Sequence, residues 1–247
     1  MKRRSPFLWA VLAGLAVIAA AFAPVLWQML NPVPAAAPAA ARGGLPAPWQ
    51  IEPDGQGGLR AFGLRLPGST LADARALWGD ELQVAVIASR GQPAALEAYT
   101  DRYSGGGVNG KLVLASDAQP AAVLRWQDRS PRREPIDAHA MRWQLHADDR
   151  AEALRAGVAG LSFVPANRLD AATLQARFGT PAEVLAGEGR ARHWLYPDRG
   201  LAIAWDEGSG RAVMQVVMPA DFERRLRAPL RSASNAAASA PAAGPPR

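Results

Sequence analysis

The 247-residue sequence contains no cysteine. This absence excludes a disulfide-stapled scaffold, a zinc–thiolate site, a thiol nucleophile and a lipid attached to an N-terminal cysteine. It does not exclude the periplasm, because a domain with a sufficient core folds there without disulfides. The apolar content of 49% is enough to form such a core.

Histidine is scarce, with only His139, His146 and His193 in the chain. The first two lie seven positions apart in a predicted strand, so their side chains point to opposite faces and cannot share a metal ion. His193 alternates with Leu195 in another predicted strand, where a packed histidine is a simpler interpretation than a ligand. We therefore predict no metal site.

Motifs for catalysis are also missing: there is no Gly-x-Ser-x-Gly, His-Glu-x-x-His or kinase motif. A glycine-rich run at 105–110 lacks the Gly-Lys-Ser/Thr ending of a phosphate-binding loop, and we interpret it as a hairpin turn. The pair Asp148-Asp149 is typical of the first turn of a helix. Glu183 or Glu188 could supply one carboxylate of a wall hydrolase, but the sequence suggests no second carboxylate. We predict a protein that is not an enzyme and carries no cofactor.

Positive charge predominates overall, with a formal net charge of +6, but the excess is confined to the two ends of the chain. Between Trp49 and Pro219 there are 19 Arg and Lys residues against 20 Asp and Glu residues. A region of balanced charge lacks the broad basic surface that binds a phosphate backbone. The sequence therefore predicts no nucleic-acid partner.

A long uncharged run at 7–30 follows a basic N-terminus at 1–6. At about 1.5 Å per residue this run reaches roughly 36 Å, enough to cross a hydrocarbon core of about 30 Å. Basic residues keep the N-terminus in the cytoplasm, so we predict a single span in the inner membrane and a periplasmic C-terminal domain. The alternative is a signal peptide cleaved after Ala23 or Ala41, although such peptides have a shorter apolar region.

Composition and hydrophobic pattern divide the rest of the chain. We predict a linker rich in Pro and Ala at 31–48, a first α+β unit at 49–135, a second at 136–228 and a disordered tail at 229–247. The charged segment at 130–135 is interpreted as a hinge between the units. Outside the two segments described next, strands are predicted at 49–52, 59–66, 94–103, 108–116, 136–146 and 161–164, and helices at 120–127, 148–156 and 220–226.

The clearest fold unit lies at 167–218. The spacing of Leu174 and Phe178 predicts a helix over 170–178, which Gly179 should end with a left-handed cap. A meander of three strands follows, at 191–196, 201–205 and 212–218.

A similar pattern occurs earlier in the chain. Thr70 and Asp73 predict a capping box at the start of a helix that ends at Gly79 and leads into a strand at 83–88. Aligning Gly79 with Gly179 superimposes the two helices and the strand that follows each, which indicates an internal duplication. The predicted fold class is α+β: an N-terminal transmembrane helix, then two repeated units, each with short helices packed on an antiparallel sheet.

Several short motifs of the second unit are similar to those of a known family. They are Phe178-Gly179-Thr180-Pro181, Trp194-Leu195-Tyr196-Pro197 and the glycines at 200, 208 and 210. On these residues the chain resembles the small-protein-A/outer-membrane-lipoprotein-A family, which implies a helical hairpin on a three-stranded sheet. Two such units in tandem are similar to the β-lactamase inhibitor proteins, whose curved sheet binds a protein. The chain lacks the lipidated cysteine of the lipoprotein, and as a whole it resembles anchored proteins of Gram-negative bacteria with no known activity.

Arg192, Trp194 and Tyr196 share one face of a predicted strand, and these residue types often anchor protein interfaces. The alternative is that Trp194 and Tyr196 are core residues. The sequence therefore predicts a membrane-anchored adaptor that binds another envelope protein through these three residues. A periplasmic sensor of a small or cell-wall-derived ligand is the alternative function.

Overall fold

The computed structural model describes residues 45–238. The predicted membrane span at 7–30 and most of the predicted linker lie outside the described residues. Within 45–238 no helix is both long and apolar enough to cross a membrane.

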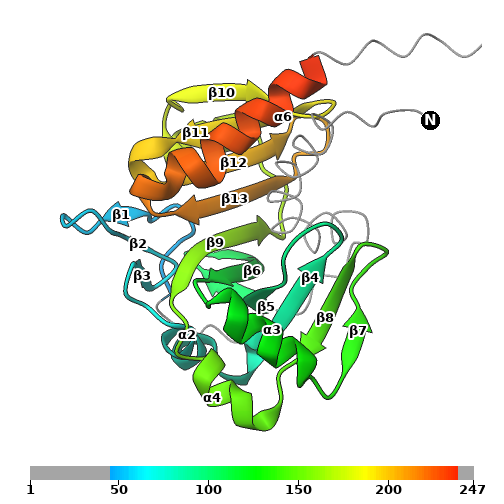
Figure 1. Ribbon diagram of the computed structural model, residues 1–247. Coiled ribbons are helices and arrows are strands. Elements are labelled where there is room, and N and C mark those ends of the chain that lie inside the picture. The colour runs from blue at the N-terminus through cyan, green and yellow to red at the C-terminus, as the bar shows by residue number, and fades with distance from the viewer. Residues whose placement is uncertain (1–44, 239–247) are drawn as a thin grey trace, which may run out of the picture.

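A single antiparallel sheet of ten strands forms the centre of the structure (Figure 1). Its strand order is β10-β11-β12-β13-β9-β6-β5-β4-β8-β7. In chain order the strands are β4 (Gln83–Ser89), β5 (Ala95–Gly105), β6 (Val108–Ser116), β7 (Arg133–Pro135), β8 (Ala140–Gln144), β9 (Val158–Pro165), β10 (Glu183–Ala186), β11 (Ala191–Tyr196), β12 (Leu201–Asp206) and β13 (Ala212–Val217). The central strand β9 pairs with β13 along one edge and with β6 along the other.

This sheet shows that the predicted fold class was wrong. We expected separate sheets in 49–135 and 136–228, but β9 joins the strands of both halves. The predicted boundary also falls inside the β7–β8 hairpin, and 130–135 supplies an edge strand instead of a hinge. Two separate sheets would each expose two edges with unpaired N–H and C=O groups, whereas sharing β9 removes an edge from each half.

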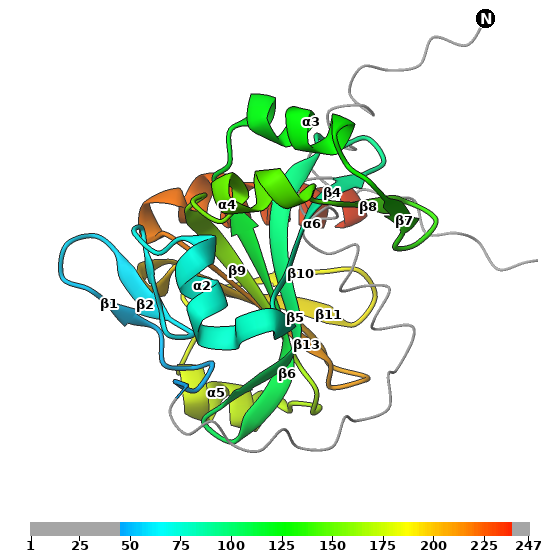
Figure 2. The ribbon, with the colours of Figure 1, turned by 90° about the horizontal axis from the view of Figure 1, so that it is seen from below.

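One face of the large sheet, called here the inner face, carries the main core. A row of directly opposed residues crosses five strands through Leu112, Phe163, Met214, Ile203 and Trp194. On this face lie a small sheet of β1 (Glu52–Pro53), β2 (Leu59–Ala61) and β3 (Leu64–Leu66), and the helices α2 (Leu71–Trp78), α3 (Pro120–Asp128) and α5 (Ala171–Phe178) (Figure 2). The small sheet and each of the three helices contribute buried residues to the same apolar cluster.

The opposite, outer face is covered in the second half by the C-terminal helix (Figure 1). A π-helical turn at Glu223–Arg227 leads into α6 (Ala228–Ala238). Phe222, Leu226 and Leu230 pack on Leu195 and Val217 and are all nearly inaccessible. The predicted helix at 220–226 is therefore longer than expected, and the predicted tail at 229–247 is helical as far as residue 238 because its first residues bury an apolar side.

Both predicted helix starts are confirmed. Thr70 accepts a hydrogen bond from the backbone N–H of Asp73, whose carboxylate accepts one from the N–H of Thr70. Asp170 likewise accepts from the N–H of Thr173. Gly79 and Gly179 end the helices with φ of 62° and 77° but ψ of −142° and −168°, a positive-φ conformation outside the predicted left-handed helical region. Only glycine adopts this region readily.

Three other predictions need local correction. The predicted strand at 59–66 is the β2–β3 hairpin, which turns at Phe62 and Gly63 with φ of 55° and 83°. The strand predicted at 136–146 begins only at Ala140. The carboxylate of Asp137 accepts hydrogen bonds from the backbone N–H groups of His139 and Ala140, which holds 137–140 in a turn. The helix predicted at 148–156 is a 3-10 turn followed by the short helix α4 (Arg150–Ala153).

Candidate functional site: an arginine-lined cleft

The three residues predicted to bind a partner lie on the inner face of β11. Tyr196 is 6% exposed, and its hydroxyl donates a hydrogen bond to the carbonyl of Gly179 at 3.0 Å. Trp194 packs edge-on against Trp205 with ring centroids 5.9 Å apart. Arg192 lies 3.5 Å from the carboxylate of Glu207. The structure brings the three side chains together, but Tyr196 offers almost no surface to a partner.

The three histidines are far apart in the fold. His139 lies in the turn before β8, His146 caps the 3-10 turn before α4, and His193 lies on β11. Burial lowers the pKa of His193, which favours its neutral form. Within residues 45–238, no three His, Asp or Glu side chains are grouped closely enough to hold a metal ion.

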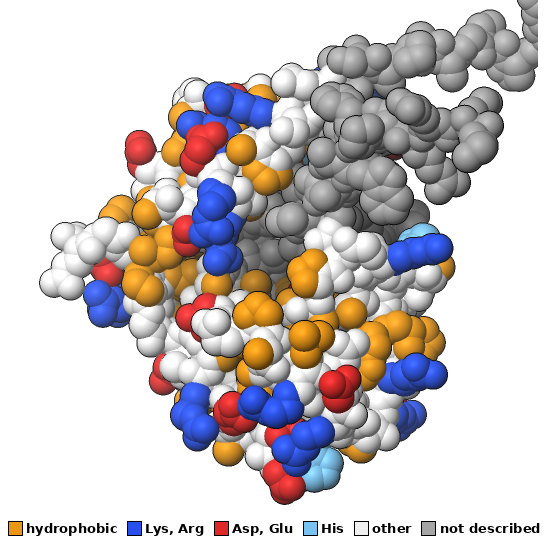
Figure 3. Space-filling view, in the orientation of Figure 1, with side chains coloured by type: hydrophobic (Ala, Val, Ile, Leu, Met, Phe, Trp, Pro, Cys, Tyr) orange, Lys and Arg blue, Asp and Glu red, His pale blue; other side chains and the backbone are white. Residues whose placement is uncertain are grey.

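Asp148 and Asp149, the predicted helix start, belong to a charged cluster between α3 and α4, the region where charged side chains gather at the lower edge of Figure 3. Asp149 is 3% exposed and accepts a hydrogen bond from Arg129 at 3.0 Å. Arg125 donates to both oxygens of Glu152 at 2.6 and 2.7 Å. These ion pairs hold α3 to α4, and both arginines already have a carboxylate partner. The other carboxylate oxygen of Asp149 is buried and has no hydrogen-bond partner within residues 45–238.

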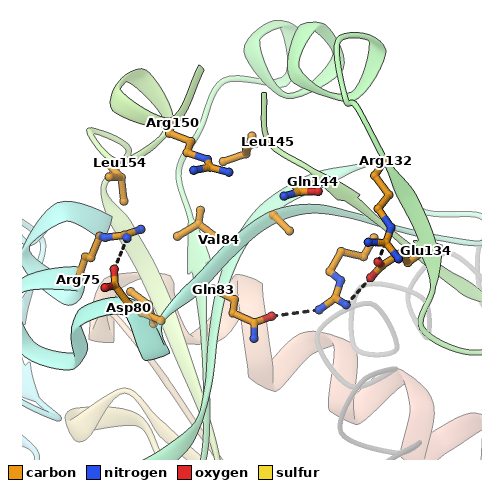
Figure 4. A pocket seen from close by; sticks show the side chains of 13 residues that line it. Arg75, Asp80, Gln83, Val84, Arg132, Glu134, Gln144, Leu145, Arg150 and Leu154 are labelled. Atoms are coloured by element: carbon orange, nitrogen blue, oxygen red, sulfur yellow. Dashed lines mark hydrogen bonds and ion pairs between the residues drawn. The ribbon is translucent and has the colours of Figure 1, made fainter. Parts of the chain in front are cut away.

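A cleft of about 350 Å³ opens where β4 begins and β8 ends (Figure 4). This volume lies near the lower end of the range for small-molecule sites. Its lining comes from α2 and the turn after it, from β4, from the β7–β8 hairpin and from α4. The lining residues are Arg75, Asp80, Leu82, Gln83, Val84, Ala85, Arg132, Glu134, Arg142, Gln144, Leu145, Arg150 and Leu154.

Apolar side chains form the floor of the cleft. Leu82 and Leu145 are 2% and 3% exposed and belong to the main core. Val84 and Leu154 are partly buried and pack against the same core. The rigid floor follows from these core contacts, so the shape of the cleft is fixed by the packing of the sheet.

The walls of the cleft carry four arginines and two carboxylates. On one wall Arg75 donates to Asp80 at 2.6 Å. On the other, Glu134 is bound by Arg132 at 2.8 Å and by Arg142 at 2.6 Å. The hydrogen bond from Arg142, followed by the charge of Arg132, lowers the pKa of Glu134.

Arg150 extends into the same space from the first residue of α4 (Figure 4). No carboxylate among residues 45–238 pairs with it. The cleft therefore has an excess of positive charge and one free guanidinium, in a region whose charge is otherwise balanced. Arginine recognises carboxylates and phosphates through two parallel hydrogen bonds.

Sequence reasoning did not find this cleft. Its arginines are spread over positions 75–150 and follow no local motif. The one local signal was the run of charges at 130–135, which we interpreted as a hinge. The residues meet only because β8 pairs with β4, placing Gln144 opposite Ala85 and Arg142 opposite Ile87.

A further ionisable group, Glu97, lies on the outer face of β5 and is not itself part of the cleft lining. It lies opposite Ala115 of β6 on one side and opposite Ala85 of β4, a cleft residue, on the other. Burial raises the pKa of Glu97 to about 8, so this carboxyl is largely neutral near neutral pH.

No family model, no curated protein and no solved structure matches the chain. The resemblance to the small-protein-A/outer-membrane-lipoprotein-A family therefore stays a prediction.

Proposed function

We propose that this protein is a non-enzymatic binding module, anchored in the inner membrane by residues 7–30, which holds an anionic group of another envelope molecule in the arginine-lined cleft. The cleft is the observation that carries the proposal. It has four arginines against two carboxylates, and one of those arginines, Arg150, has no partner within 45–238.

The partial burial of the cleft arginines above an apolar floor supports an anion as the ligand. The side chains of Arg75 and Arg142 are 41% and 39% exposed, so these two guanidinium groups are partly shielded from water and are stronger donors to an anion than they would be on an open surface. The floor contributes apolar contact area to any ligand that carries a hydrophobic part next to its charge. A partner protein and a small cell-wall-derived ligand both offer such a combination, and both would use the same cleft.

Binding is tested with simple anions on the full chain in a mild detergent. Citrate and inorganic phosphate are titrated, and the melting temperature is measured, because a ligand that binds only the folded state raises it. We expect a rise with at least one anion, lost in Arg150→Ala and retained in Arg90→Ala, since Arg90 is an exposed arginine outside the cleft. An equal response in both variants would contradict the cleft as the site.

Topology is tested separately. A C-terminal alkaline phosphatase fusion should be active, because that enzyme folds only outside the cytoplasm, and the protein should fractionate with the inner membrane. An inactive fusion combined with an active cytoplasmic reporter would overturn the proposed location without affecting the cleft.

A further inference from the structure

The two carboxylates of the cleft differ in how firmly they are held. Glu134 is bound by two arginines, and its side chain is 34% exposed. Asp80 is bound by Arg75 alone, and its side chain is 96% exposed. Because exposed single ion pairs contribute little to stability, Asp80 can leave Arg75 easily, whereas Glu134 is a fixed part of the wall.

The departure of Asp80 would create a second free guanidinium beside the first. Arg75 and Arg150 come from α2 and α4, and both extend toward the space above Val84 (Figure 4). Leu154 lines the cleft between them, and Leu145 forms the floor. A ligand carboxylate placed at this position would meet two cations and an aliphatic surface.

This arrangement favours one class of ligand over the others. A compact inorganic anion uses the arginines but not the apolar floor. A nucleic acid requires a wider basic surface than one cleft in a charge-balanced region. An acidic side chain next to an aliphatic one satisfies both parts of the cleft, and this combination is common in protein segments.

We infer that the cleft takes a segment of a partner protein in which glutamate or aspartate lies next to an aliphatic residue, and that Asp80 occupies Arg75 as an internal stand-in for the ligand carboxylate. This inference rests on the proposed function. Asp80 competes with the ligand, so removal of its charge strengthens binding.

The test uses an acetylated, amidated hexapeptide of alternating leucine and glutamate, and the same peptide with glutamine in place of glutamate. Both are titrated by calorimetry against the full chain in detergent. We expect the glutamate peptide to bind at least about tenfold more tightly than the glutamine peptide, because only glutamate forms charge-assisted hydrogen bonds with the arginines. Arg150→Ala should weaken binding by a similar factor, and Arg90→Ala should leave it unchanged.

The variant that decides the matter is Asp80→Asn, which keeps the shape of the side chain and removes its charge. We expect it to bind the glutamate peptide several-fold more tightly than the wild type, with an unchanged melting temperature in the absence of peptide. Unchanged or weaker binding, or equal binding of the two peptides, would overturn the inference. If citrate or phosphate binds through Arg150 but the peptide does not, the inference fails and the anion-binding function stands; if none of them binds, both fail.

Discussion

The two halves of the sheet contain similar local segments in different surroundings. Each has a capped eight-residue helix that ends at a glycine of positive φ, and each helix leads toward an outer strand of a meander. In the first half the outer strand β4 gains β8 as a neighbour, and the cleft opens at their ends. In the second half β10 is the edge of the sheet and α6 covers the outer face.

Arginine is used differently in the two halves as a result. On α6, Arg231 donates to both oxygens of Glu183 at 2.9 and 3.0 Å. Arg227, the last residue of the π-helical turn before α6, lies 3.2 Å from the same carboxylate. These pairs tie the helix to β10. In the cleft, Arg150 has no such carboxylate within 45–238. An arginine is therefore structural where a carboxylate of a neighbouring element faces it, and it stays available to a ligand where no carboxylate does.

The largest expected effect concerns whether the two halves of the sheet unfold in one cooperative transition. Phe163 is fully buried on the shared strand β9, with its ring 5.4 Å from Phe62 and 5.1 Å from Tyr103. Phe163→Ala should lower the free energy of unfolding by about 3–5 kcal/mol. Denaturation followed by tryptophan fluorescence and circular dichroism should show one shifted transition. Two separate transitions would mean that the halves are independent.

The next prediction concerns the pH dependence of stability, which we expect to depend on Glu97 in the first half. Because the pKa of Glu97 is raised from 4.5 to about 8, the folded state binds more protons than the unfolded state between these values. The contribution of Glu97 to stability therefore falls as pH rises through this window, by up to about 1.4 kcal/mol per pH unit.

Glu97→Gln should abolish this slope, so the variant should gain stability over the wild type at pH 8 and match it near pH 5. Chemical denaturation at both pH values measures the difference. The lowered pKa of His193 produces an opposite slope in both proteins, so it cancels in the comparison. Parallel pH profiles would show that Glu97 titrates normally.

The equivalence of the two helix starts predicts a smaller pair of effects. Thr70→Ala and Asp170→Ala each remove a side chain that accepts a backbone N–H. We expect each to lower the free energy of unfolding by about 1 kcal/mol. A much larger effect at one cap, measured by urea denaturation, would show that the two helices are not equivalent in the folded protein.

The smallest effects are expected when the paired Arg231 and the unpaired Arg150 are each replaced. Arg231→Ala loses an exposed but bidentate pair with Glu183 and should lower stability by about 0.5 kcal/mol. Arg150→Ala loses no ion pair and should leave stability unchanged. Thermal denaturation in the absence of anions distinguishes them. Destabilisation by Arg150→Ala of the same size would mean that Arg150 is structural.

The accuracy of the sequence predictions depended on how far apart the interacting residues lie. The cap at Thr70, the helix over 170–178, the ends of both helices at glycine and the meander after residue 190 were predicted because each depends on residues a few positions apart. The joining of the halves through β9 was missed, since strands with apolar residues do not specify their neighbours. The hydrogen-bonding role of Asp137 likewise shortened a strand that alternation alone had extended.

Composition, short-range sterics and local hydrogen bonding set the balanced charge of 49–219, the lack of thiol chemistry and the positions of most helices and strands, so these properties could be predicted from the sequence. The sharing of one sheet by ten strands, and the meeting of Arg75, Arg142 and Arg150 in one cleft, follow instead from long-range strand pairing. Strand pairing brings together residues far apart in the chain, and the free energy that selects one pairing comes from burial and from satisfied edges over the whole molecule.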